Sequence, residues 1–155
     1  MGRSYSSSAP KRRFLIKLDI EFDCSGVDWK LVSETLKRVG MAYDKPGAHK
    51  KSFDNSYVTV FIYRDGQLIG FGRAISDGVF QAAIYDVAVI PEYQKNGVGR
   101  IIIESLLERL SQCNIILYSS PGKEGFYETM RLRKMKTGMA LFRKAEQMKE
   151  KGFTE

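Results

Sequence analysis

Cysteine and histidine are scarce in this sequence of 155 residues, which contains only Cys24, Cys113 and the single histidine His49. Two distant cysteines exclude the dense disulfide framework that holds many small secreted domains together, and they favour a reducing compartment. One histidine without a cysteine cluster also argues against the common zinc-binding patterns. We therefore expect free thiols, no bound metal and a cytoplasmic location.

Long apolar runs are missing as well. No stretch approaches the roughly 20 consecutive apolar residues of a membrane-spanning helix, and no signal peptide with an apolar centre is recognisable. The composition, with 43% hydrophobic and 28% charged residues, is instead typical of a globular domain. We expect a basic, serine-rich disordered tail over residues 1–13, one domain over 14–145 and a polar end over 146–155, with no membrane span.

Positive charge is abundant but uneven. The net charge is +7, and the stretch "RLRKMK" at 131–136 contains four cationic residues. Such a cluster suits either a phosphate-bearing ligand or a solvated surface, and charge alone leaves both interpretations open.

Local patterns predict alternating strands and helices. Asp28 is placed to cap a helix that Gly40 ends, and Asp65-Gly66 is a strong hairpin signal. A mixed sheet with helices on its faces follows from this order. The expected strands are 14–20, two within 56–76, 79–90, 114–120 and 138–143, and the expected helices are 29–40, a short one within 41–56, 97–113 and 122–130.

Two glycines, Gly97 and Gly99, stand where the strand 79–90 gives way to a helix. The first N–H groups of a helix lack partners, the helix dipole adds positive potential, and glycine lets an anion come close. The flanking Lys95 and Arg100 add charge, so this turn is a candidate site for a diphosphate. The dinucleotide-binding fingerprint is excluded because Ile102 replaces its third glycine, and the GxxxxGK[ST] phosphate-binding loop is absent.

The stretch "DVAVIPEYQKNGVGRIIIESLLERL" (86–110) resembles the acetyl-CoA signature of the GCN5-related N-acetyltransferases, the GNAT superfamily, whose core is [QR]-x-x-G-x-[GA]. "LIGFGRAISDG" (68–78) resembles the strand pair that precedes it, and "GKEGFYETMRLRKMKTGMALF" (122–142) resembles the closing segment. The similarity spans residues 14–143.

This resemblance implies an α/β (α+β) GNAT fold, a mixed and mostly antiparallel sheet of about six or seven strands with about four helices. The sheet should open where the strand 79–90 parts from the strand 114–118. Acetyl-CoA would be the co-substrate, with no metal. Its pantetheine arm would bind main-chain groups of Val87, Ala88 and Val89, and its diphosphate would bind Gln94, Lys95, Asn96, Gly97, Val98, Gly99 and Arg100.

Direct acetyl transfer to a primary amine needs a base, an oxyanion donor and an acid. Asp86 is the candidate base, although it could equally face solvent or pair with a cation such as Arg73. The resemblance implies the Val87 N–H as the oxyanion donor. It also implies Tyr127, close to the sulfur of the co-substrate, as the acid; the alternative is that Phe126 and Tyr127 are simply a packed aromatic pair.

One departure from the family pattern follows this tyrosine. Where a Gly-Phe pair is usual, this chain has Arg131-Leu132. We expect either a different helix ending or an Arg131 side chain directed towards co-substrate or acceptor.

The acceptor is less well determined. Arg73, Asp86 and Arg131 are the candidate acceptor-binding residues, and the cations favour glucosamine 6-phosphate, which would place the protein in amino-sugar metabolism. The aromatic residues Tyr43, Phe53, Tyr57 and Phe80 would instead suit an arylalkylamine, and a protein lysine or N-terminal amine is a further alternative.

The resemblance also implies a homodimer. A distant alternative is an RNA-binding module, suggested by "IGFGRAI" (69–75), but we expect no nucleic-acid partner.

Overall fold

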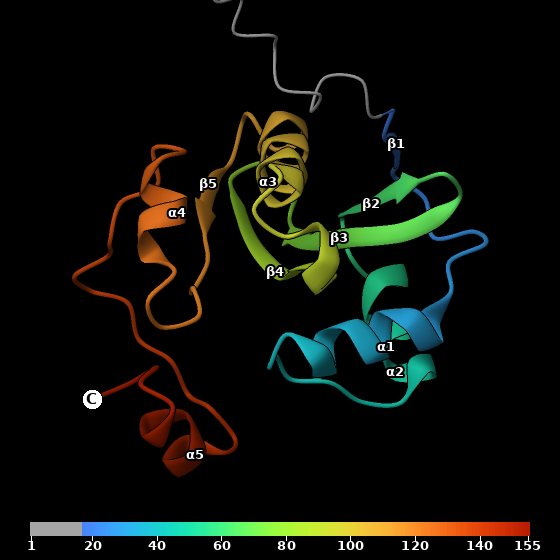
Figure 1. Ribbon diagram of the computed structural model, residues 1–155. Helices are drawn as coiled ribbons and strands as arrows, with labels where there is room; N and C mark the ends of the chain where they lie inside the picture. Colours follow the sequence, from blue (N-terminus) through green and yellow to red (C-terminus); the bar gives the residue numbers. More distant parts are fainter. Residues whose placement is uncertain (1–16) are drawn as a thin grey trace, which may run out of the picture. The chain divides into compact units, whose positions relative to one another are not determined.

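The computed structural model describes residues 17–155 (Figure 1). The expected tail 1–13 and the beginning of the expected first strand lie outside the described residues. The described chain forms two compact units, divided between Ile116 and Leu117. We refer to residues 17–116 as the first unit and to residues 117–155 as the second unit.

The first unit is built on a sheet of five strands in the order β1-β2-β3-β4-β5. Neighbouring strands are antiparallel except for β4 and β5, which run parallel. The expected mixed, mostly antiparallel sheet is therefore confirmed, with five strands rather than six or seven. The strands are β1 (Asp19–Glu21), β2 (Val58–Arg64), β3 (Gln67–Ser76), β4 (Gln81–Val89) and β5 (Asn114–Ile116).

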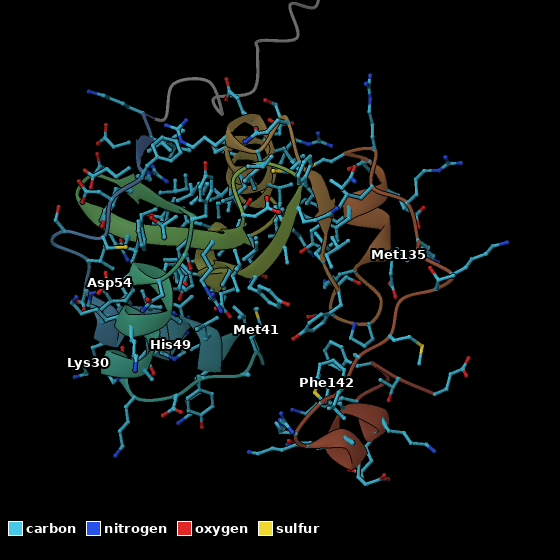
Figure 2. All side chains as sticks on the ribbon, turned by 180° about the vertical axis from the view of Figure 1, so that it is seen from behind. Lys30, Met41, His49, Asp54, Met135 and Phe142 are labelled. Atoms are coloured by element: carbon cyan, nitrogen blue, oxygen red, sulfur yellow. The ribbon has the colours of Figure 1, made fainter. Side chains whose placement is uncertain are left out.

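Two helices, α1 (Trp29–Arg38) and α2 (Pro46–Asp54), cover one face of this sheet (Figure 1). As expected, Asp28 caps α1: its Oδ1 accepts a hydrogen bond from the Leu31 N–H at 3.1 Å. Figure 2 shows Lys30, His49 and Asp54 on this helical layer. Burying their apolar faces against the sheet stabilises helices too short to persist alone. The core below them contains Val32, Leu36, Phe53, Phe61 and Phe71.

The helix α3 (Val98–Arg109) packs on the opposite face (Figure 1). Glycines in β3 make this close approach possible. A Cβ atom on Gly72 would lie 2.7 Å from Ile102 Cγ2, and one on Gly70 would lie 3.0 Å from Ile102 Cδ1. Larger residues at these positions would push the helix away from the sheet. This packing fixes the start of α3 beside the end of β4.

The second unit contains two short helices, α4 (Glu124–Glu128) and α5 (Ala145–Glu150). An aromatic cluster packs within it, since the Phe142 ring lies 5.4 Å from that of Tyr118 and 6.5 Å from that of Phe153. Figure 2 labels Phe142 and Met135 in this unit. The polar end expected over 146–155 contains most of α5.

The strand expected over 138–143 is wrong: these residues form no strand. Met139 and Leu141 in this apolar stretch are 96% and 82% exposed. A short apolar run alone does not make a strand, because a strand also needs a neighbour that pairs with its main-chain groups. Two other elements are shorter than expected, since α3 ends at Arg109 and β5 ends at Ile116.

No helix within residues 17–155 is long and apolar enough to cross a membrane.

Candidate active site

The sheet opens along β4. Pairing between β4 and β5 covers only three residue pairs and stops at Ala83 and Ile116. In the described part of the chain, no strand pairs with residues 86–89 on this side. The parting of the two strands that the resemblance implied is therefore confirmed. An edge of this kind offers main-chain donors and acceptors to an extended ligand.

At the end of β4, a hydrogen bond shows towards which edge the main-chain groups point. The Ile90 N–H donates to the Ile69 carbonyl in β3 at 2.9 Å. Since main-chain groups of successive residues point to opposite edges, those of Val89 point towards the open side. The Gln94 side-chain amide uses one of them, because its Nε2 donates to the Val89 carbonyl at 3.0 Å. Gln94 thus ties the following turn to the strand end.

A β-bulge interrupts β4 in the middle of this edge. Phe71 pairs with Ala88 and Arg73 pairs with Tyr85, so Asp86 and Val87 together oppose the single residue Gly72. Asp86 has a φ of +54°, in the left-handed region. A bulge bends the strand and changes the direction of the neighbouring main-chain groups. Sequence reasoning missed this feature.

Asp86 pairs with Arg73, as one of the alternative interpretations held. The Arg73 Nε donates to Asp86 Oδ2 at 2.6 Å, and the two side chains are 15% and 22% exposed. The guanidinium group also lies over two aromatic rings, 5.8 Å from the Phe53 centroid and 5.4 Å from the Tyr85 centroid. Two of the predicted site residues, Arg73 and Asp86, are therefore in direct contact.

The turn between β4 and α3 has the conformation expected of an anion site. A 3₁₀ helix, Pro91–Tyr93, leads into Lys95 with a φ of +61° and Gly97 with a φ of +84°. Gly97 is the N-cap of α3 and supplies no side chain to the first helical N–H groups. These groups have no acceptors inside the helix. The first turn of α3 can therefore donate hydrogen bonds to an anionic group.

The other residues predicted for this turn are placed around its backbone. Val98 is buried, with 3% of its surface exposed, so it contributes only main-chain groups to the turn. The Asn96 side chain donates to the Gln94 carbonyl at 3.1 Å, and the Arg100 side chain contacts Glu104 at 3.0 Å. The structure thus brings together residues 86–89, 94–100 and Arg73 in the first unit.

Tyr127 lies on α4 in the second unit. Its ring contacts that of Phe126 at 5.0 Å in an edge-to-face arrangement. Burial raises the pKa of the Tyr127 phenol above its ordinary value of 10.0. The group therefore stays protonated at neutral pH and can donate a proton.

Arg131, also in the second unit, ends α4 in the way that a glycine usually does. Its φ is +69°. The Arg131 N–H donates to the Glu128 carbonyl at 3.1 Å and the Leu132 N–H donates to the Tyr127 carbonyl at 3.3 Å. These two bonds form the Schellman ending. Arg131 thus adopts the backbone conformation and the hydrogen bonds that glycine usually has at such an ending.

An open cleft of about 440 Å³ lies on the first unit beside the paired part of β4. None of its lining residues is lysine or arginine. Its one charged residue, Asp77, accepts hydrogen bonds from the main-chain N–H groups of Val79, Phe80 and Gln81, which lower the pKa of its carboxyl. The lining residues are Ile75, Ser76, Asp77, Gln81, Ala82, Ala83, Tyr85 and Ile116.

No group of three or more His, Cys, Asp or Glu side chains within residues 17–155 is arranged to hold a metal ion. His49 is engaged in the fold, since its Nε2 accepts a hydrogen bond from the Asp44 N–H at 2.8 Å.

Several known proteins are similar in sequence to this chain. Serotonin N-acetyltransferase 2, chloroplastic, from Oryza sativa subsp. japonica is 31% identical over 135 residues, which cover 80% of this chain and 67% of the rice protein. GCN5-related N-acetyltransferase 1, chloroplastic, from Arabidopsis thaliana is 46% identical over 65 residues, which cover 40% of this chain and 33% of that protein. Uncharacterized N-acetyltransferase ycf52 from Pyropia yezoensis is 30% identical over 119 residues, which cover 72% of this chain and 62% of the algal protein. The match thus spans less than two thirds of the last two relatives.

Solved structures share the fold. A GNAT-family acetyltransferase from Streptococcus pneumoniae TIGR4 has a TM-score of 0.70 at 20% identity, covering 83% of this chain and 99% of that one. Glucosamine-6-phosphate N-acetyltransferase from Arabidopsis thaliana has a TM-score of 0.62 at 18% identity, covering 82% and 99%. The sequence profile described as "Acetyltransferase (GNAT) family" matches residues 27–130, which is more than half of the chain. The chain belongs to the acetyltransferase (GNAT) family.

Proposed function

We propose that this protein transfers the acetyl group of acetyl-CoA directly to a primary amine. The observation that carries the proposal is the open edge of β4 at residues 86–89, which leads into the first turn of α3, where no side chain caps the helix. A long ligand with an amide-containing arm at one end and a diphosphate at the other suits both parts. Family membership supports acetyl-CoA as that ligand.

Main-chain groups are proposed to do most of the binding. Those within residues 87–89 that face the open side would pair with the pantetheine arm as an added strand does. The N–H groups of residues 94–100 would hold the diphosphate, helped by the dipole of α3. Gly97 suits the binding of a diphosphate, because a capping side chain at this position would accept hydrogen bonds from the same N–H groups of α3.

Two groups are proposed for the chemistry. An alkylammonium acceptor has a pKa near 10.4, so it must lose a proton before its nitrogen attacks the thioester; Asp86 is the candidate base from the sequence, in competition with its role as the ion-pair partner of Arg73. The new C–N bond forms as the C–S bond breaks. The Val87 N–H would stabilise the charge that develops on the carbonyl oxygen, and the Tyr127 phenol would protonate the leaving thiolate.

For the acceptor, the cleft beside β4 favours an aryl or other apolar amine over the glucosamine 6-phosphate that the cationic residues suggested. Apart from Asp77, its lining contains apolar and neutral side chains with Tyr85 among them, and it has no cation that would neutralise a phosphate. Among the relatives, the rice protein is named for serotonin, an arylalkylamine. A protein amine remains the third candidate.

The proposal is tested by thermal unfolding and by thiol release. We expect acetyl-CoA, and not RNA, to raise the unfolding temperature. Thiol release should then be faster with aryl amines than with glucosamine 6-phosphate or lysine-containing peptides. Stabilisation by RNA alone would overturn the enzyme assignment, whereas a preference for the sugar phosphate would overturn only the acceptor.

Two further properties are proposed on the resemblance and the composition alone. A homodimer is checked by light scattering during size-exclusion chromatography. The cytoplasmic location is checked by cell fractionation against a plastid location, since several relatives have "chloroplastic" in their names.

A further inference from the structure

Asp86 occupies an unfavourable backbone conformation. It is the first of the two residues that oppose Gly72 in the bulge of β4, and its φ is +54°. Glycine is usual at this position of a bulge whose first residue is left-handed. Aspartate is among the side chains that tolerate this region better than most, but it is still less favourable there than glycine. A contact of the carboxylate therefore has to favour aspartate here.

That contact is the ion pair with Arg73. Arg73 lies on β3 directly opposite Tyr85, the residue before Asp86, so the 2.6 Å hydrogen bond crosses from one strand to the other at the bulge. Both side chains are mostly shielded from water, and solvent screens such a pair much less than an exposed one. The pair therefore acts as a brace between β3 and the bulged residue.

Arg73 is itself fixed by its surroundings. Its guanidinium group lies over the rings of Phe53 and Tyr85, and its Nη1 donates to Ser56 Oγ at 3.4 Å. Phe53 belongs to α2 and is only 1% exposed. Arg73 thus links the position of the bulge to the helical layer on the α2 face of the sheet.

We propose that Arg73 is a positioning residue, which acts through Asp86 to hold the bulge and so sets the direction of the Val87 N–H. The importance of that direction for the rate rests on the proposed function. The proposal gives Asp86 a geometric role in place of the role of base, and the two roles make different predictions. A base must be a carboxylate, whereas a brace needs only an acceptor for the Arg73 hydrogen bond at a residue that tolerates a positive φ.

Four variants separate these roles in steady-state kinetics. Asp86→Asn keeps an acceptor and tolerates the left-handed region, so its kcat should stay within about tenfold of the wild-type value. Asp86→Gly suits the backbone but removes the brace, and Arg73→Met removes the other partner. Each should lower kcat by about 10² while the KM for acetyl-CoA changes little. The double variant Arg73→Met/Asp86→Gly should be no slower than either single variant, because each already lacks the brace.

The opposite pattern would overturn the proposal. If Asp86 is the base, Asp86→Asn loses at least 10² in kcat together with the acidic limb of the pH–rate profile, and Arg73→Met remains active. A wild-type kcat in Asp86→Gly would show that no brace is needed. Glu34→Gln, which breaks the exposed ion pair with Lys30 on α1, is the matched control and should leave kcat unchanged.

A measurement that does not depend on enzyme activity separates the proposed brace from the proposed acetyl transfer. In ¹H–¹⁵N spectra of the free protein, the Val87 amide signal should shift or broaden in Arg73→Met, whose substituted residue is not a sequence neighbour of Val87, and should keep its position in Glu34→Gln. An unchanged Val87 signal in Arg73→Met contradicts the brace. If the wild-type protein transfers no acetyl group, the proposed function fails, but this spectrum still decides whether the brace exists.

Discussion

At the scale of single residues, the phenol of Tyr127 is expected to donate a proton in the transition state. We predict that Tyr127→Phe lowers kcat by about 10² or more, with little change in the Kd of acetyl-CoA, because a general acid acts only during the reaction. Rapid-mixing kinetics and calorimetry measure the two quantities. Tyr63→Phe is a suitable control, since burial also raises the pKa of this phenol but Tyr63 lies on β2. An unchanged kcat in Tyr127→Phe would remove Tyr127 from the mechanism.

The same residue predicts a pH dependence. Burial raises the pKa of Tyr127 above 10.0, so the phenol keeps its proton to a higher pH than an exposed tyrosine does. We therefore expect no loss of kcat from Tyr127 as the pH rises from 7 to about 8.5, and any loss from its ionisation to begin at a higher pH than it would for an exposed tyrosine. A decline in this range that is absent from Tyr127→Phe would contradict the assignment.

Arg131 offers a test of stability. Its φ of +69° is a conformation that glycine adopts without steric cost. We predict that Arg131→Gly raises the free energy of unfolding by about 0.5–1 kcal/mol, as urea denaturation would measure. Arg133→Gly, two residues further on, lies at no positive φ and should not be stabilising. A loss of stability in Arg131→Gly would mean that contacts of the arginine side chain outweigh the backbone strain.

At the scale of elements, the first turn of α3 is expected to bind the diphosphate. We predict that Gly99→Val weakens the binding of acetyl-CoA at least about tenfold, or 1.4 kcal/mol, because a branched side chain would stand where the diphosphate approaches. Calorimetry measures the Kd. Gly47→Val is the matched control, since Gly47 is likewise the second residue of a helix and has open space around it. Equal affinities in both variants would show that the turn is misassigned.

Elements that depend on neighbouring residues were predictable from the sequence. The Asp28 cap needs only the three residues that follow it. Asp65 and Gly66 close the hairpin because both adopt a positive φ, +50° and +76°. Gly97 is left-handed at the head of α3 for a similarly local reason. The turn of the candidate site could therefore be placed before the fold was known.

Features that depend on pairing between distant segments were not predictable. The bulge at Asp86 exists only in relation to Gly72 on the neighbouring strand. The contact with Arg73 was one of three alternatives for Asp86, and the register of β3 and β4 selects it. At residues 138–143 the sequence predicted a strand that the structure does not contain, because the short apolar run finds no strand to pair with within residues 17–155.

At the scale of the whole molecule, the net charge of +7 should affect how fast the co-substrate binds. Acetyl-CoA is polyanionic, so a cationic protein attracts it over a distance that salt shortens. We predict that the association rate constant falls several-fold between about 0.02 and 0.2 M NaCl, as stopped-flow fluorescence would record. A rate constant that is independent of salt would show that the positive charges lie away from the approach to the site.

The central claim is that the main chain of β4 and of the first turn of α3 binds the co-substrate. A titration of the ¹⁵N-labelled protein with CoA, followed amide by amide in ¹H–¹⁵N spectra, tests this claim most directly. We expect the largest shifts of amide signals in the first unit at residues 87–89 and 94–100, with no comparable shifts in α1. Saturable binding with unchanged signals in both of these segments would contradict it.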